Sequence, residues 1–348
     1  MLCEQHKSKQ REMIFGLVHP LLDISATVDQ QYLDRFGLKA NDGILAQEKH
    51  REIYDELLNG SKFDVKKIPG GATQNALRVA QWYLRERHAT TIVGCVGDDK
   101  VGQDMRELLD REGCRTELMV AEGANTGTCA VLVSAGANRS MVTRLDAANL
   151  YKHSHLISDK VWSIVQESSF FYVSSFMLNC SCDTITTIGD YAVEANKCFM
   201  MNLSAPYLSS LFKDAMQTVL PYCDIVVGNS DEALALADNF KFNATELQDV
   251  VKMLADLPKH NKQRKRIVMI TQQELPVIVY SEGRIVEYPV IPISPEDIVD
   301  TNSAGDAFVG GFLASYAVGK PLKDCVQNGI EAAHMILKVS GCTLTLRD

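Results

Sequence analysis

The stretch that decides the fold class runs from Phe170 to Leu203 and reads FFYVSSFMLNCSCDTITTIGDYAVEANKCFMMNL. Its ends are short apolar runs, Phe170 to Val173 and Phe199 to Leu203. Between them, Asp183 to Asn196 carries apolar residues at three- and four-residue spacing, which predicts an amphipathic helix. Two apolar runs joined by such a helix are typical of neighbouring parallel strands, so this stretch predicts a strand–helix–strand unit.

The same alternation continues along most of the chain. Further strands are expected at Met13 to Val18, Thr91 to Val96, Ile225 to Val227 and Ile267 to Ile270. Further helices are expected at Thr73 to Arg87, Gly102 to Glu112, Ala244 to Leu257, Ala304 to Val318 and Leu322 to Val339. The pattern predicts an α/β fold built on a doubly wound, mostly parallel sheet.

Two regions interrupt this alternation. Thr128 to Val133 and Ser140 to Leu145 form a predicted hairpin around Ala135–Asn138, and 22–69 lacks a clear strand–helix rhythm. We expect both regions to build a small β-containing lid, made of 22–69 with 115–148, on a core of 1–21, 70–114 and 149–348. A second hairpin, Val277 to Tyr280 with Ile285 to Tyr288, is expected at the edge of the main sheet.

The charge balance argues against a nucleic-acid partner. The 348 residues carry 35 basic and 44 acidic side chains, a net charge of −9, which repels phosphate unless basic residues gather on one face. The basic residues that cluster in sequence are Lys259, Lys262, Arg264, Lys265 and Arg266. Because they lead directly into an apolar run, we interpret them as a solvated approach to a strand.

Neither a membrane span nor secretion is expected. The longest uncharged segment, Ser168 to Cys182, has 15 residues and is too short and too polar to span a bilayer. The amino terminus lacks the apolar core of a signal peptide, so we expect a cytoplasmic protein. Its ten cysteines should then be thiols, and their spacing indicates no zinc site.

The segment Asp300-Thr301-Asn302-Ser303-Ala304-Gly305-Asp306 places small residues directly before a predicted helix. Unpaired N–H groups at a helix N-terminus bind phosphate oxygens. Asp306 in the first turn either acts on a substrate or merely stabilises the helix start. Because a helix N-terminus tends to lower the pKa of a nearby carboxyl, we expect Asp306 to be a weak base.

Two other segments carry candidate ligand-binding groups. Pro69-Gly70-Gly71-Ala72-Thr73-Gln74-Asn75 lets the backbone approach a ligand through Gly70 and Gly71, with Asn75 as donor and acceptor, although an ordinary turn and cap would use the same residues. Asp23 follows the first strand, near the sheet edge where open parallel sheets bind ligands. Its two oxygens are suited to the two hydroxyls of a vicinal diol.

Asn229 and Glu232 follow the strand Ile225 to Val227. Their oxygens suit Mg²⁺ with its waters, although a helix cap with Glu three residues on explains the same pattern. The chain has no Gly-x-x-x-x-Gly-Lys-Ser/Thr loop, no Gly-x-Gly-x-x-Gly after the first strand and no Gly-x-Ser-x-Gly. These absences argue against P-loop phosphotransferases and dinucleotide oxidoreductases.

Taken together, these segments resemble the ribokinase-like family of sugar and nucleoside kinases, most closely its eukaryotic adenosine kinases. The resemblance covers nearly the whole chain. It rests on Pro20–Ser25, Gly70–Asn75, Thr126–Ala130, Asn202–Pro206, Gly228-Asn229 and Asp300–Asp306, which occur in the family's order. It implies transfer of the ATP γ-phosphoryl group to the 5′-hydroxyl of adenosine, giving AMP and ADP, as in purine salvage.

The resemblance also implies the role of each site residue. Asp306 would be the catalytic base, and the backbone of Asn302, Ser303, Ala304 and Gly305 would form the anion hole, approached by Arg139 from the lid. Asp23, Gly70, Gly71 and Asn75 would bind the sugar, and Leu21, Phe176 and Tyr207 would enclose the base. Asn229 and Glu232 would serve Mg²⁺, through water. The partners would be a nucleoside and ATP, with a monomeric protein.

Several positions depart from the adenosine kinase pattern. Ser303 replaces a glycine, but its amide remains available for phosphate. His19 replaces an asparagine, Ala72 a serine and Gly43 a glutamine near the nucleoside site. The substrate could therefore be another nucleoside or a sugar, and a catalytically silent nucleotide-binding regulator is a further alternative that the intact Asp306, Asn229 and Glu232 disfavour.

Overall fold

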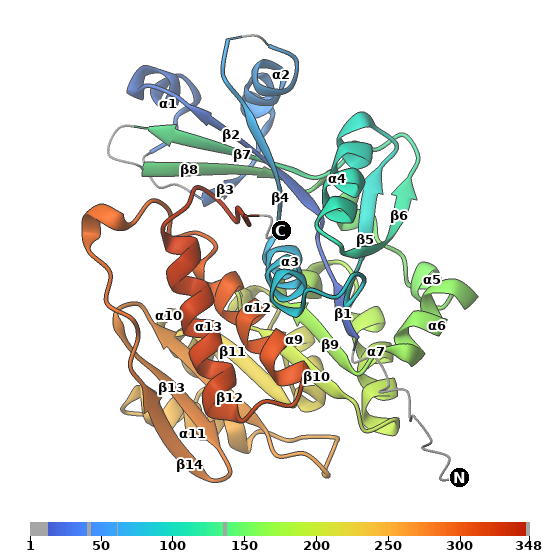
Figure 1. Cartoon of the computed structure of the whole chain (residues 1–348), viewed down its shortest axis with the longest axis vertical. Helices are drawn as coiled ribbons and strands as arrows, with labels where there is room; N and C mark the ends of the chain where they lie inside the picture. The colour runs from blue at the N-terminus through green and yellow to red at the C-terminus, as the bar shows by residue number, and fades with distance from the viewer. Residues whose placement is uncertain (1–12, 40–42, 61, 135–137, 346–348) are drawn as a thin grey trace, which may run out of the picture.

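The computed structural model describes residues 13–39, 43–60, 62–134 and 138–345. Their strands form two sheets, one of nine strands and one of five. In Figure 1 the small sheet lies at one end of the molecule, with helices α1 (Gln30–Phe36) and α2 (Arg51–Asn59) on its outer side. The tip of the expected hairpin at 135–137 lies outside the described residues.

The large sheet confirms the expected doubly wound, mostly parallel fold. Its strands, in spatial order, are β14 (Arg284–Tyr288), β13 (Leu275–Ser281), β12 (Ile267–Gln272), β11 (Ile225–Asn229), β10 (Cys198–Asn202), β9 (Phe170–Ser174), β1 (Ile14–Leu17), β5 (Thr90–Gly97) and β6 (Arg115–Ala121). All neighbours pair in parallel except β12 with β13 and β13 with β14. The antiparallel hairpin thus lies at the sheet edge, as predicted.

Side chains of the central strands alternate between two helical layers. In β1, Phe15 and Leu17 point into one apolar core. Ile14, which precedes Phe15 and therefore faces the other side of the sheet, points into the other core. The layer that packs with Ile14 contains α3 (Ala72–Leu84), α4 (Lys100–Arg111), α12 (Ala304–Ala317) and α13 (Leu322–Leu337). The layer that packs with Phe15 contains α5 (His153–Leu156), α6 (Asp159–Glu167), α7 (Cys182–Glu194), α8 (Leu208–Leu211), α9 (Lys213–Val219), α10 (Ser230–Asn239) and α11 (Leu247–Asp256).

Only two strands of the small sheet, β7 (Thr128–Ser134) and β8 (Asn138–Arg144), were predicted from the sequence pattern. The spatial order of this sheet is β3 (Gly43–Leu45), β8, β7, β2 (Leu21–Thr27) and β4 (Lys66–Gly70). One face packs on α1 and α2 through a separate apolar cluster that includes Ile24, Leu132 and Tyr54. Short 3₁₀ turns complete the chain at η1 (Glu48–His50), η3 (Asp146–Leu150), η4 (Ser175–Asn179), η5 (Leu220–Tyr222) and η6 (Pro295–Asp297).

The expected lid range differs from the small sheet at one strand. Arg115 to Ala121 was expected in the lid, but it forms β6, which pairs with β5 in the large sheet. Arg115, Thr116 and Glu117 are all half-buried, so the apolar run that marks a central strand is absent at the start of this edge strand.

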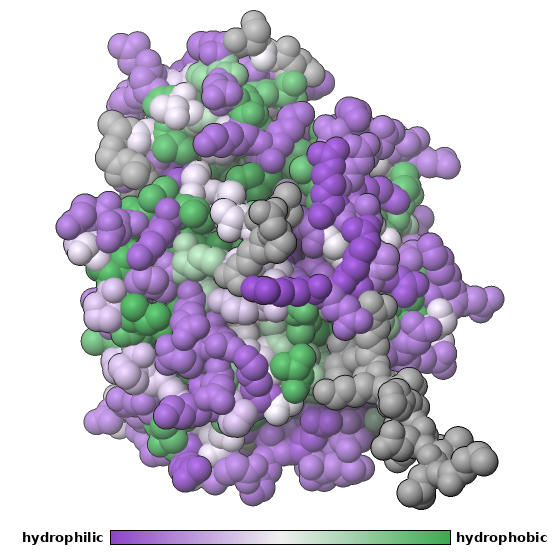
Figure 2. Space-filling view, viewed as in Figure 1, coloured by the Kyte–Doolittle hydropathy of each residue, from purple (hydrophilic) through white to green (hydrophobic). Residues whose placement is uncertain are grey.

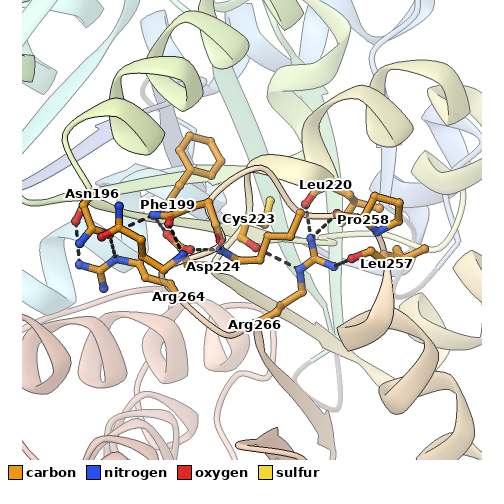
Figure 3. A network of polar contacts seen from close by, with 12 residues as sticks. Asn196, Phe199, Leu220, Cys223, Asp224, Leu257, Pro258, Arg264 and Arg266 are labelled. Carbon is orange, nitrogen blue, oxygen red and sulfur yellow. Dashed lines mark hydrogen bonds and ion pairs between the residues drawn. The ribbon is translucent and has the colours of Figure 1, made fainter.

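The basic cluster before β12 is solvated only in part, because Lys262 and Lys265 are exposed as expected whereas the other three members bind neighbouring segments. Arg266 is 3% exposed and donates to five backbone carbonyls, those of Leu220, Cys223, Leu254, Leu257 and Pro258. Lys259 pairs with the buried Asp224, and Arg264 binds Asn196. Figure 3 shows the labelled members of this network gathered around Asp224 and Arg266. These cations therefore tie together the chain segments that enter β10, β11 and β12.

The face of the molecule shown in Figure 2 is mostly hydrophilic, with apolar residues in small groups between the polar ones. Across the described residues, no helix combines the length and the apolar character that a membrane crossing requires. The cysteines in these residues are all free thiols, as expected.

Candidate active site

The candidate site lies where the first turns of α3, α10 and α12 approach the carboxyl ends of the central strands. Asn75 in α3 donates from Nδ2 to Asp306 Oδ2 in α12 at 3.1 Å. The carboxylates of Asp23 and Glu232 lie close enough to Asp306 for their charges to raise its pKa. The fold thus brings together groups from four distant segments, at the edge of the sheet where open α/β sheets bind ligands.

Gly70 and Gly71 pack directly against the first strand of the small sheet. A Cβ on Gly70 would lie 2.2 Å from the Asp23 carboxyl carbon, so only glycine fits beside this side chain. Gly71 has a φ of +93°, and its Cβ would lie 2.6 Å from the His19 carbonyl oxygen. The pairing of β2 with β4 sets this contact, because it places Leu21 opposite Gly70.

Asp306 is a stronger base than the sequence predicted. Burial raises its pKa to about 7, the hydrogen bond from Asn75 opposes the rise, and the charges of Asp23 and Glu232 add to it. The expectation of a pKa lowered by the helix end is therefore wrong in direction. Burial likewise raises the pKa of Asp23 to about 7, which the nearby charge of Arg78 opposes and that of Asp300 increases.

The expected anion hole is only partly available in this structure. Ser303 occupies the N-cap position of α12 but makes no side-chain cap hydrogen bond. The amide of Asn302 already donates to Asp300 Oδ1 at 3.0 Å, and that of Ala304 to the Thr301 carbonyl at 3.3 Å. Gly305 has open space where a Cβ would be. A phosphate would therefore approach the helix end most directly at Gly305.

Arg139 in β8 reaches the segment before α12. Its Nε lies 3.2 Å from Asp300 Oδ2, and its Nη2 donates to Ser340 Oγ and to the Val299 carbonyl. Arg139 and Asp300 are 8% and 5% exposed, so this is a buried ion pair between the small sheet and the candidate phosphate loop. Sequence spacing gave no indication that Asp300 would hold this arginine.

The three expected nucleoside walls differ in their surroundings. Leu21 is half-buried and packs closely on Gly127, where an added Cβ would lie 2.7 Å from the Leu21 Cδ2. Phe176 in η4 packs against the core beside α7, whereas Tyr207 is 57% exposed at the start of α8. His19 is buried with its Nε2 3.2 Å from Cys180 Sγ, and burial lowers its pKa to about 4. His19 is therefore a neutral imidazole at physiological pH.

Asn229 and Glu232 form a reciprocal cap at the start of α10. Asn229 Oδ1 accepts from the Glu232 amide at 2.9 Å, and Glu232 Oε2 accepts from the Asn229 amide at 3.0 Å. Burial raises the pKa of Glu232 to about 7. No group of three or more His, Cys, Asp or Glu side chains that could hold a metal ion occurs within the described residues. These oxygens fit Mg²⁺ only as one side of a site in which waters fill most positions.

Sequence reasoning missed Arg78, which is 1% exposed and contacts both Asn75 and Glu112. Its sequence signal is a charged residue, three positions after Asn75, within an otherwise apolar helix face. A buried arginine on such a face needs several acceptors, which single-helix patterns do not reveal.

A parallel sheet whose strand ends face a helix start without a side-chain cap is the arrangement with which many α/β proteins bind phosphorylated ligands. Residues 30–348 match the model of the pfkB family carbohydrate kinases, and the chain belongs to this family, whose members are ATP-dependent phosphotransferases. The match spans nearly all the described elements.

Relatives within the family share most of their length with this chain. Adenosine kinase 1 of Arabidopsis thaliana is 41% identical over 331 residues, which cover 95% of each protein. Adenosine kinase of Schizosaccharomyces pombe is 40% identical over 335 residues, covering 96% of each. A crystal structure of Anopheles gambiae adenosine kinase in complex with P1,P4-di(adenosine-5) tetraphosphate superposes with a TM-score of 0.87 at 41% identity, covering 95% of this chain and 96% of that one. The fold and the ribokinase-like resemblance are thereby confirmed.

Proposed function

We propose that this protein is an adenosine kinase, which transfers the γ-phosphoryl group of ATP to the 5′-hydroxyl of adenosine and yields AMP and ADP. The observation that carries the proposal is Asp306 held by Asn75 at the start of α12, a helix whose first turn has no side-chain cap. The similar proteins named adenosine kinase support the choice of acceptor. The reaction would return a free purine nucleoside to the nucleotide pool as AMP.

The sugar would bind between the two sheets. Asp23 would accept hydrogen bonds from two ribose hydroxyls, and the backbone at Gly70-Gly71 would approach the sugar because neither glycine carries a Cβ. Asn75 would contact the sugar on the same side. Leu21 and Phe176 would contact the base, and Tyr207 would cover it from its exposed position.

Asp306 would accept the proton of the 5′-hydroxyl as the phosphoryl group is transferred. A pKa near 7 suits a base that works at neutral pH, because the carboxylate is then both substantially ionised and basic enough to take a proton. The start of α12 and Arg139 would neutralise charge on the transferred oxygens. Phosphoryl transfer depends mainly on such positioning and charge neutralisation.

The small sheet would act as a lid, within the ranges 22–69 and 115–148 less strand β6. Closure over the nucleoside would exclude water, which otherwise competes with adenosine as acceptor. Arg139 supports this proposal, because its side chain already extends from the small sheet to the loop before α12.

Mg²⁺ would accompany ATP and supply charge neutralisation at its phosphates. Glu232 and Asn229 would hold waters of the hydrated ion, with Glu232 in its ionised form. Because burial raises the pKa of Glu232, a nearby dication would favour loss of its proton. We further infer a cytoplasmic monomer, in keeping with the free thiols and the acidic net charge of −9.

A panel of acceptors tests the proposal. The purified protein is incubated with ATP and Mg²⁺ and with adenosine, other nucleosides, ribose or no acceptor, and ADP is measured. We expect adenosine to give the highest kcat/KM and ADP formation to require an acceptor. Preference for another nucleoside would contradict the proposed substrate and would point to His19, Ala72 and Gly43 as the residues that change it. Absence of turnover with every acceptor would instead favour a nucleotide-binding regulator.

A further inference from the structure

Arg78 of α3 makes a set of contacts that joins the end of α4 to the candidate site. Its Nε and Nη2 donate to the two Glu112 oxygens, each at 2.6 Å. Its Nη1 donates to the Pro69 carbonyl at 2.6 Å and to Asn75 Oδ1 at 3.3 Å. The bidentate contact with Glu112 and the short bond to Pro69 fix the plane of the guanidinium, so the group that faces Asn75 cannot turn away.

Asn75 continues the chain to the start of α12. Its Nδ2 donates to Asp306 Oδ2 at 3.1 Å and lies 3.4 Å from Ser303 Oγ. Arg78 can only donate hydrogen bonds, and an ionised Asp306 can only accept them. The Asn75 amide between them is therefore held in one orientation, with its oxygen toward Arg78 and its NH₂ group toward Asp306. The reversed amide would turn two acceptors toward each other at Asp306.

The residue type at position 78 fits this use. The guanidinium binds three partners in one plane, whereas a lysine ammonium is a compact charge that cannot keep the bidentate contact and the two remaining bonds in the same geometry. A buried ion pair often adds little to stability compared with apolar side chains of the same volume. The contacts of Arg78 are thus better explained by what they orient than by stability alone.

We propose that Arg78 is a positioning residue, which acts through Asn75 to keep a hydrogen-bond donor on the carboxylate of Asp306. The inference rests on the proposed phosphoryl transfer and deepens it. Glu112 and Pro69 anchor the guanidinium, Arg78 orients the amide, and the amide sets both the position and the basicity of Asp306. Loss of the oriented amide removes a hydrogen bond that lowers the pKa of Asp306 against its burial.

The test compares Arg78→Lys with a matched control, Arg87→Lys. Arg87 pairs with Asp110, two residues before Glu112, at 2.6 Å, but both side chains of this pair are more than half exposed. We expect Arg78→Lys to lower kcat/KM for adenosine by about 10²-fold, as for a reacting group displaced by about 1 Å. The acidic limb of the pH–rate profile should move to higher pH. Arg87→Lys should change neither by more than about twofold.

A double-mutant cycle then separates action through Asn75 from a general structural effect. In an Asn75→Ala background, Arg78→Lys should lower kcat/KM by less than about threefold, because the residue through which it acts is gone. An undiminished loss in that background overturns the proposal. So does an Arg78→Lys enzyme whose pH limb matches that of the wild type while only its thermal stability falls.

Two further measurements keep the proposal testable under other outcomes. If Arg78→Lys does not fold, Glu112→Gln keeps the guanidinium but loosens its anchor, and we expect the same upward shift of the limb, smaller in size. If the protein turns over no acceptor, ¹³C-carboxyl labelling of aspartate, with Asp306→Asn to assign the signal, titrates Asp306 directly. A pKa of Asp306 that is unchanged by Glu112→Gln and Arg78→Lys refutes the action of Arg78 through Asn75. Missing turnover alone refutes only the proposed reaction.

Discussion

Arg139 in the small sheet and Asp300 before α12 form a buried ion pair, with Nε and Oδ2 3.2 Å apart. The same carboxylate accepts from the amides of Asn302 at 3.0 Å and Gly341 at 2.7 Å. Asp300 therefore joins three segments: strand β8 of the small sheet, the candidate phosphate loop and the chain after α13. Because carboxylate and phosphate groups both bind guanidinium strongly, a phosphate at this loop would compete with Asp300 for Arg139.

Arg139→Lys tests this relationship. Lysine retains the charge beside Asp300 but loses the planar fork, so the protein should fold normally while charge neutralisation in the transition state weakens. We expect kcat to fall by about 10²-fold, the effect of losing one well-placed donor, with little change in adenosine affinity. Steady-state kinetics and calorimetry measure the two effects separately. A loss confined to adenosine binding would assign Arg139 to the nucleoside instead.

Asp306→Asn removes the candidate base but preserves its shape. Asparagine still fits beside Asn75, so adenosine should bind with only a modest loss, whereas kcat should fall by about 10³-fold, within the range for general bases. Binding is measured by calorimetry without ATP, and turnover by ADP release. Residual activity above about a tenth of the wild type would exclude Asp306 as the base, because that loss is below the range for this kind of catalysis.

The pKa of Asp306 predicts how activity depends on pH. Only the ionised carboxylate accepts a proton, and burial raises its pKa to about 7. We expect kcat/KM to fall about tenfold per pH unit below pH 7. The limb for kcat should lie at lower pH, because Arg139 and a bound cation favour the charged form once ATP is present. Coincident limbs for kcat and kcat/KM would show that bound ATP leaves Asp306 unaffected.

Three carboxyl groups of the candidate site make the free energy of unfolding of the unliganded protein depend on pH. Asp23, Asp306 and Glu232 each have a folded pKa of about 7, well above their ordinary values of 3.8 and 4.5. The folded state therefore binds protons more tightly than the unfolded state, so their contribution is greatest below about pH 4 and is lost as pH rises toward 7. Asp306→Asn should flatten this dependence in thermal unfolding between pH 5 and 7.5.

Asp23→Ala tests the proposed diol contact. Without the carboxylate, adenosine should bind at least about tenfold more weakly, since two charge-assisted hydrogen bonds are lost. The loss should be smaller for 2′,3′-dideoxyadenosine, which lacks both hydroxyls. An equal loss for the two nucleosides, or an unchanged KM for adenosine, would refute the diol role of Asp23.

The sequence predicted the large sheet well because its central strands are buried on both faces. β5 and β9 therefore appear as nearly continuous apolar runs, which are simple to recognise. β2, with the sequence LLDISAT, is half-buried and alternates, and β4 contains Pro69 at the edge of the small sheet. Such strands resemble loops in sequence, and only their pairing partners show that they belong to a sheet.

The candidate site was predictable where one segment carries it. Asn75 and Asp306 belong to local motifs at helix starts, and the resemblance to kinases rests on such motifs. The Arg78–Glu112 contact joins residues 34 positions apart, and the Arg139–Asp300 pair joins the small sheet to the loop before α12. The raised pKa of Asp306 likewise results from burial by several elements, which no local spacing encodes.

Arg266 offers a prediction about stability away from the site. It donates to five carbonyls in and beside η5 and α11, of which those of Leu220 and Leu254 also accept from the amides of Cys223 and Leu257. Burial lowers the pKa of Arg266, yet the carbonyl dipoles stabilise its charge. Arg266→Met would leave several of these acceptors buried without donors, at a cost of about 3 kcal/mol or more in the free energy of unfolding.

The matched control is Lys265→Met, because Lys265 precedes Arg266 but is 71% exposed and pairs with Glu282 at the surface. We expect this change to alter the free energy of unfolding by less than about 0.5 kcal/mol. Urea unfolding at fixed pH measures both variants. Arg266 lies at the amino end of β12, whereas the candidate site lies at the carboxyl ends of the strands, so folded Arg266→Met should keep the KM for adenosine and the pH–rate profile of the wild type. A stable Arg266→Met protein with altered kinetics would instead connect this end of the sheet to the site.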